Sequence, residues 1–206
     1  MRQSEILYHG TYRLFDEFST SFSGSGEGHS KFGQGGIYIT SSYKTAARYA
    51  AKAAKKNGEG NFYVYTIDVP VLTDNNHIFS NKPVNKEIVS RTEAALGETI
   101  PDTATILGKH FRKYLGNLLT GQRNTIKKMT EKANDEAEIA ATTFLRTIDI
   151  VYLAWPQAQT KPDGVTNRLA LNATDIKILK IEQVEVNDKN DLIDNSQKII
   201  KEYGFF

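Results

Sequence analysis

The chain has 206 residues, 39% of them hydrophobic, so it can bury one sizeable core, or a core with an appended subdomain, but not two large domains. Its 26 basic and 24 acidic residues nearly cancel, which argues against a nucleic-acid partner or a membrane surface. Cysteine is absent, and this excludes disulfides, thiolate zinc sites and a cysteine nucleophile.

The N-terminal residues are polar and lead into an apolar patch that is too short for a signal peptide. No segment approaches the ~20 consecutive apolar residues that a membrane helix requires. We therefore expect a soluble protein that is cytoplasmic, or secreted into a host cell without a cleaved N-terminal signal.

The first third of the chain combines short strands with one helix. Strands are predicted over residues 6–8, 37–40 and 62–69, a Gly- and Ser-rich loop over residues 19–36, and a helix over residues 43–56. Ser41 or Ser42 can cap the helix, and Pro70 ends the third strand because proline has no N–H for a sheet ladder.

Between about residues 85 and 146 the pattern changes to a helical one. Helices are predicted over residues 86–96, 104–119 and 125–145, with Gly97, Pro101 and Gly121 between them. Basic residues in this region, Arg112 among them, are expected on solvated helix faces, with docking of an acidic partner as the alternative. The region is predicted to be a helical insertion.

Strand patterns return in the last third of the chain, over residues 148–153, 168–171 and 176–184. Residues 187–206 are predicted to form a short amphipathic helix. Without regular βαβ alternation, the pattern favours a split α+β fold over a doubly wound sheet. We expect a single domain over residues 1–206.

Two segments of the first third carry motifs. The first is Tyr8-His9-Gly10-Thr11, at the end of a predicted strand. The second is the glycine turn and strand Gly35-Gly36-Ile37-Tyr38, which is followed by a helix that carries Tyr49, with ten residues between the two tyrosines.

A third segment, residues 166–172, lies near the C-terminus and is followed by an Ile-rich strand. In this order, the three segments resemble the motifs of ADP-ribosyltransferases of the His-Tyr-Glu type, the group of diphtheria toxin and the poly(ADP-ribose) polymerases. The resemblance implies an α+β fold with a split β-sheet core, and the helical insertion falls between the second and third motifs. It also implies a mono-ADP-ribosyltransferase of bacterial or phage character, an effector or toxin that uses NAD+ as co-substrate to modify a target protein.

The resemblance also assigns roles to single residues. His9 would bind a ribose hydroxyl, Gly10 would pair through its backbone with the nicotinamide amide, and Thr11 would complete that motif. Gly35 and Gly36 would let the backbone approach the dinucleotide. Tyr38 and Tyr49 would hold the nicotinamide ring between them, because stacked aromatic rings fix a ring plane.

Two positions depart from the family pattern. Asn167 lies where the family has its catalytic glutamate, and Ala46 lies where a serine commonly bonds the nicotinamide amide. We take Asn167 as the third catalytic residue with His9 and Tyr38, and we note Glu136, Glu138 and Asp163 as carboxylates that could substitute.

Other functions remain open at this point. The alternative to a transferase is a catalytically inactive module that binds NAD+ or ADP-ribose, and a third possibility is a structural component that keeps the fold without a ligand. No metal is expected, since His29, His77 and His110 are scattered without the spacing of metal ligands.

Overall fold

The computed structural model describes residues 3–20, 35–122, 131–156 and 166–204. Within these residues the chain is a mixed α+β protein with one eight-stranded mixed sheet and five α-helices. The strands are β1 (Ser4–Thr11), β2 (Ile37–Thr40), β3 (Tyr63–Pro70), β4 (His77–Phe79), β5 (Tyr152–Pro156), β6 (Thr166–Ala170), β7 (Lys177–Gln183) and β8 (Lys198–Glu202). Their order in the sheet is β4-β5-β6-β2-β1-β3-β7-β8, and only β4 and β5 are parallel neighbours.

The sheet is joined unevenly on the two sides of β1. β1 and β3 share eight register pairs, whereas β1 and β2 share only the pair Tyr8↔Thr40. The strands thus form one continuous sheet rather than two separate ones, but its two parts are joined in the middle by a single pair.

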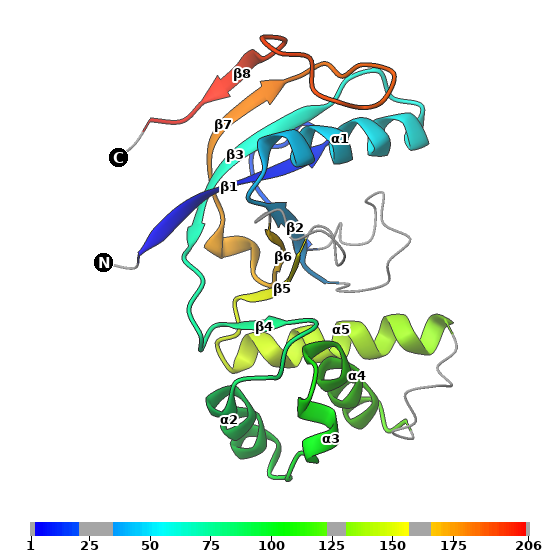
Figure 1. Cartoon of the computed structure of the whole chain (residues 1–206), viewed down its shortest axis with the longest axis vertical. Helices are drawn as coiled ribbons and strands as arrows, with labels where there is room; N and C mark the ends of the chain where they lie inside the picture. Colours follow the sequence, from blue (N-terminus) through cyan, green and yellow to red (C-terminus); the bar gives the residue numbers. More distant parts are fainter. Residues whose placement is uncertain (1–2, 21–34, 123–130, 157–165, 205–206) are drawn as a thin grey trace.

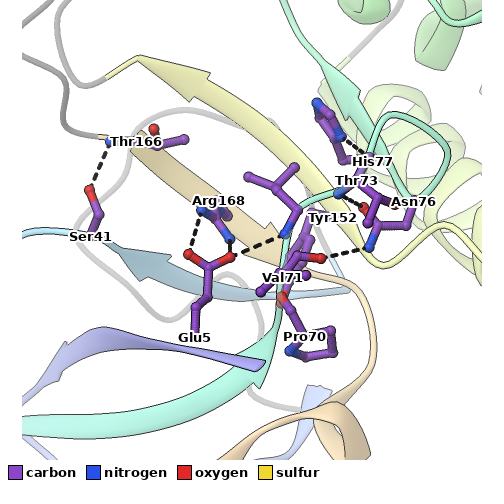
Figure 2. Close-up of polar contacts among 11 residues, drawn as sticks. Glu5, Ser41, Pro70, Val71, Thr73, Asn76, His77, Tyr152, Thr166 and Arg168 are labelled. Atoms are coloured by element: carbon purple, nitrogen blue, oxygen red, sulfur yellow. Dashed lines mark hydrogen bonds and ion pairs between the residues drawn. The ribbon is translucent and has the colours of Figure 1, made fainter. Parts of the chain in front are cut away.

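An ion pair adds a second connection between the two parts (Figure 2). The Arg168 guanidinium of β6 donates to both carboxylate oxygens of Glu5 on β1, at 2.6 and 3.2 Å. Glu5 also accepts a hydrogen bond from the backbone N–H of Leu72, which follows β3. Nearby, the Tyr152 hydroxyl of β5 donates to the Pro70 carbonyl.

Helix α1 (Tyr43–Asn57) packs against the face of β1 and β3, as Figure 1 shows. Ser42 caps its start by accepting a hydrogen bond from the Thr45 N–H, and Gly58 ends it in the left-handed conformation, with φ of 71°. The helix comes very close to β1, because a Cβ on Gly10 would lie 1.9 Å from the carbonyl oxygen of Ala46.

The other helices gather at the opposite end of the molecule, next to β4 (Figure 1). They are α2 (Lys86–Leu96), α3 (Asp102–Thr105), α4 (Gly108–Leu119) and α5 (Glu131–Thr147), and they lie where the sequence predicts the helical insertion. Their apolar side chains share one core with Leu153 and Leu169 of the sheet. A separate core, which includes Leu7, Ile39 and Tyr152, lies on the other face.

The helix predicted over residues 104–119 is two helices in the structure. α4 begins at Gly108, where a Cβ would lie 2.5 Å from the Phe79 carbonyl oxygen, and the Gly108 N–H bonds to the Lys82 carbonyl. Contact with β4 therefore sets the start of α4, and the glycine at this boundary leaves room for the backbone of Phe79.

The strand predicted over residues 148–153 begins later, at Tyr152. The preceding residues leave α5 through a turn in which Asp149 has φ of 59°, and the N–H of Val151 bonds to the Asn76 carbonyl.

The prediction of a helix over residues 187–206 is wrong. Residues 198–202 form β8, which pairs with β7 through Lys180↔Glu202 and Gln183↔Lys198, and a bridge joins Val186 to Leu192. The physical reason is that the outer edge of β7 offers unpaired backbone groups, which a second strand satisfies. Among the helices described, none is sufficiently long and apolar to span a membrane.

Candidate functional site

The structure brings the first two sequence motifs into contact where β1 and β2 separate. His9 Nδ1–H donates to the Tyr38 carbonyl oxygen at 2.6 Å. Had the ladder continued beyond Tyr8↔Thr40, the backbone of Gly10 would have faced Tyr38. The imidazole thus takes the place of a backbone donor and keeps the two strands apart.

Aromatic rings surround the half-buried imidazole of His9. Phe15, Phe18 and Tyr65 have ring centroids 6.2, 5.1 and 6.1 Å from it. Burial lowers the pKa of His9 below its usual value, and the hydrogen bond to the Tyr38 carbonyl offsets part of that effect. His9 is therefore neutral at pH 7, and its Nε2 makes no hydrogen bond to any described residue.

Gly10 and Thr11 continue β1 past the last pair with β2. Both residues pair with β3, and their opposite edge has no strand pairing among the described residues. Gly10 is required by the close approach of α1, and the Thr11 hydroxyl accepts a hydrogen bond from the Arg13 N–H at 3.1 Å. The structure thus gives Gly10 a packing role and leaves the edge that a ligand would use unpaired.

Gly35 and Gly36 lead into β2 and pack against α5 and β6. Gly35 has φ of 91°, a conformation that favours glycine, and its carbonyl accepts a hydrogen bond from the Arg146 guanidinium of α5. A Cβ on Gly36 would lie 2.5 Å from the Leu169 side chain of β6. Both glycines are therefore explained by local packing of the strand.

The ring of Tyr38 projects from β2 and is 37% exposed. It meets the indole of Trp155 edge to face, with centroids 5.8 Å apart. Burial raises the pKa of the Tyr38 hydroxyl above its usual value, and the positive charge of Arg112 on α4 opposes this rise. Tyr38 thus lies on the side of the sheet that faces α4.

Asn167 lies on β6 in the row Thr40–Asn167–Trp155 across three strands. It is 5% exposed, and its Oδ1 has no hydrogen-bond partner among the described residues. A buried amide oxygen without a donor costs about 1–3 kcal/mol and needs an explanation. A ligand that supplies an N–H or O–H would provide one.

The second tyrosine, Tyr49, does not form a ring pair with Tyr38. It is 39% exposed on α1, and no ring contact is found for it within the described part of the chain. Ala46, one turn earlier, is 1% exposed and lies under Gly10. The sandwich that the sequence predicts is therefore not preformed, and the position of the family's serine is closed off by β1.

The three carboxylates that could substitute for the glutamate, Glu136, Glu138 and Asp163, differ in their surroundings. Glu138 on α5 is 4% exposed and forms an ion pair with Arg112 of α4. Burial lowers the pKa of the Arg112 guanidinium to about 10, so it stays charged at neutral pH. Glu136 is exposed to solvent, and Asp163 lies outside the described residues.

An open cavity of about 460 Å³ touches this site only through Arg146, which donates to the Gly35 carbonyl. Its lining consists of Asn76, Arg146, Asp149, Ile150, Val151, Asn172 and Asp175, and it includes none of the predicted site residues. Among the described residues no group of three or more metal-ligating side chains comes together.

Sequence reasoning missed Trp155, Arg112 and Arg146. The signal for Trp155 was its place at the end of a strand pattern and its being the only tryptophan in the chain. The prediction that Arg112 lies on a solvated face is wrong, because its side chain is 4% exposed and pairs with Glu138. Helical periodicity alone does not distinguish a buried ion pair from a solvated one.

Comparison with protein-family models, with curated proteins and with solved structures gave no match to this chain.

Proposed function

We propose that the protein is an NAD+-dependent mono-ADP-ribosyltransferase that modifies a target protein, as an effector or toxin of bacterial or phage character. The hydrogen bond from His9 to the Tyr38 carbonyl carries this proposal, because it joins the first two motifs where β1 and β2 separate. The third motif, which contains β6, also supports the proposal, because β6 is the neighbour of β2 on the side away from β1.

His9 is suited to binding rather than to proton transfer. Its Nδ1–H is committed to the Tyr38 carbonyl, so Nε2 is the acceptor that remains for a ribose hydroxyl. The exposed ring of Tyr38 offers a surface on which nicotinamide can stack. The edge of β1 at Gly10, which has no strand partner in the described part of the chain, is where backbone groups would meet the nicotinamide amide.

In the transfer, the bond between the nicotinamide nitrogen and ribose C1′ breaks, and its electron pair leaves with nicotinamide. A nucleophile of the target protein then bonds to C1′ and loses its proton. Positive charge builds up on the ribose meanwhile, and a preorganised negative group would stabilise it. Asn167 supplies an oxygen without the charge, and loss of one such partner typically costs on the order of 10²–10³ in rate. The proposed enzyme is therefore slow.

The alternative is a catalytically inactive module that binds NAD+ or ADP-ribose. Two observations favour it: Asn167 carries no charge, and Glu138 is held in an ion pair with Arg112. Both functions use the same binding residues and differ only in turnover.

Nicotinamide release from NAD+, with and without candidate target protein from a cell lysate, tests the proposal. We expect slow release by the wild type, a loss of at least about tenfold in His9→Ala, and faster release in Asn167→Glu, which restores the carboxylate. His77→Ala is the matched control, since His77 Nδ1–H also donates to a backbone carbonyl, that of Thr73, at 2.7 Å. It should leave release unchanged.

Calorimetric titration with NAD+ separates the two functions. Binding without release, in the wild type and in Asn167→Glu, would select the inactive module. Absence of NAD+ binding would reject both.

A further inference from the structure

Three strands present Tyr38, Asn167 and Trp155 on one face of the sheet. Tyr38 lies opposite Leu169, and Asn167 lies opposite both Thr40 and Trp155. Directly opposite residues of antiparallel neighbours share a face, and so do residues two apart on one strand. Tyr38 on β2 and Trp155 on β5 are thus separated by β6, which carries Asn167.

The two rings nevertheless touch, with their centroids 5.8 Å apart at an interplanar angle of 77°. Since the strands that carry them are not neighbours, the rings lean towards each other and meet above β6. This contact places them over the segment of β6 that contains Asn167 and Leu169. Asn167 itself is buried, at 5% exposed.

We infer that Tyr38 and Trp155 form an aromatic gate over Asn167, and that the nicotinamide end of NAD+ enters by separating the two rings. The nicotinamide ring then stacks on Tyr38, and a donor group of the same end of NAD+ bonds to Oδ1 of Asn167. This inference rests on the proposed function and adds Trp155 to its site as a specificity-determining residue.

The arrangement selects for a particular ligand chemistry. A flat ring can replace the aromatic neighbour of Tyr38 by stacking on its face. A ligand with an N–H or O–H next to that ring can also satisfy the buried Oδ1, which has no donor among the residues that the structure describes. Nicotinamide riboside, with its carboxamide N–H groups and ribose hydroxyls, has both features.

Trp155 is the only tryptophan of the chain, so its fluorescence reports on the gate directly. NAD+ is titrated into the protein while tryptophan alone is excited, at wavelengths where the ten tyrosines do not absorb. A parallel calorimetric titration gives the affinity. The inference predicts a saturable change in emission with the calorimetric midpoint, because the pyridinium ring quenches an indole that it displaces or contacts.

A variant with its indole moved serves as the matched control. Trp155→Phe combined with Phe144→Trp keeps a ring at the gate and places the indole on α5, among residues of the same core. NAD+ should bind to this variant without changing its emission. Thermal melting checks that the variant is folded.

Opening the gate by mutation should speed binding. In Trp155→Ala the association rate constant of the fluorescent analogue etheno-NAD+ should rise about two- to tenfold, the Boltzmann equivalent of losing one edge-to-face ring contact. Calorimetric binding with unchanged Trp155 emission would overturn the gate and leave the proposed function intact. If NAD+ does not bind at all, both fail.

Discussion

Two regions of the molecule differ in how many buried polar atoms they contain without a hydrogen-bond partner. Around α1, β1 and β3, the buried helix face consists of six alanines and one threonine, and strand ladders hold the sheet. Around α4, α5 and β6, polar atoms of Asn117, Thr142 and Asn167 lie buried without a partner among the described residues. Each such group costs about 1–3 kcal/mol. The first region is therefore a scaffold, whereas the second retains polar groups at the expense of stability.

The largest expected effect concerns the buried ion pair of the second region. Glu138→Ala removes the carboxylate that faces Arg112 and should lower the free energy of unfolding by about 3–5 kcal/mol. Denaturant unfolding measures the change. Asp191→Ala, which removes an exposed pair with Arg48, should have no measurable effect.

The double variant Arg112→Met/Glu138→Leu sharpens this test, because apolar replacement of both partners is often close to neutral. Equal destabilisation by the single and the double variant would contradict the expectation.

The scaffold should be broken most readily by added volume. Gly10→Ala places a Cβ against the backbone of Ala46 and should cost about 2–3 kcal/mol, since a backbone carbonyl cannot move aside as a flexible side chain can. Gly60→Ala is the matched control, because there is open space around Gly60. Thermal melting of both variants gives the comparison, and similar melting temperatures would show that α1 is not tightly packed on β1.

Two Thr→Val variants compare a buried hydroxyl that lacks a hydrogen-bond partner with one that has a partner, and their expected effects are smaller. Thr142 Oγ1 is buried without a partner among the described residues, so Thr142→Val should raise the stability of the ligand-free protein by about 1 kcal/mol. Thr92 is also fully buried, but its Oγ1 donates to the Ile88 carbonyl at 2.7 Å, so Thr92→Val should lower it by a similar amount. Equal shifts of the same sign would remove the distinction.

The smallest expected effect is a pH dependence at the junction of the two regions. Burial lowers the pKa of His9 below 6.5, so between that value and its folded pKa the unfolded chain binds more protons. The contribution of His9 is therefore fully present above about pH 6.5 and is lost as the pH falls towards the folded pKa. Melting temperatures over this range should depend less on pH in His9→Gln than in the wild type. The same pH dependence in both proteins would show that His9 is not its cause.

Local signals in the sequence predicted α1 and α2 well. The Ser42 cap, the Ala-rich face and Gly58 mark α1, and the same kind of punctuation marks α2. They failed for residues 187–206, where an apolar pattern with Ile199 and Ile200 side by side does not distinguish a helix from an edge strand. There the unpaired edge of β7, a long-range feature, decides the structure.

The candidate site was predictable only in part for the same reason. The motifs place His9, Tyr38 and Asn167 on strands, but the contact of Tyr38 with Trp155 and the burial of Arg112 arise from packing between distant segments. Tyr49 shows that a motif can also predict too much. Its spacing from Tyr38 matches the family, but this spacing does not by itself bring the two rings face to face.

The position of β2 in the sheet affects when the candidate site can form during folding. β2 has one register pair with β1 but four with β6, and β6 starts 126 residues after β2 ends. During synthesis, the ladder between β2 and β6 therefore cannot form until residues 166–170 have been made. Long-range pairings of this kind are slow steps of folding. The residues around Tyr38 are assembled late, so a nascent chain stopped before residue 166 should lack the site altogether.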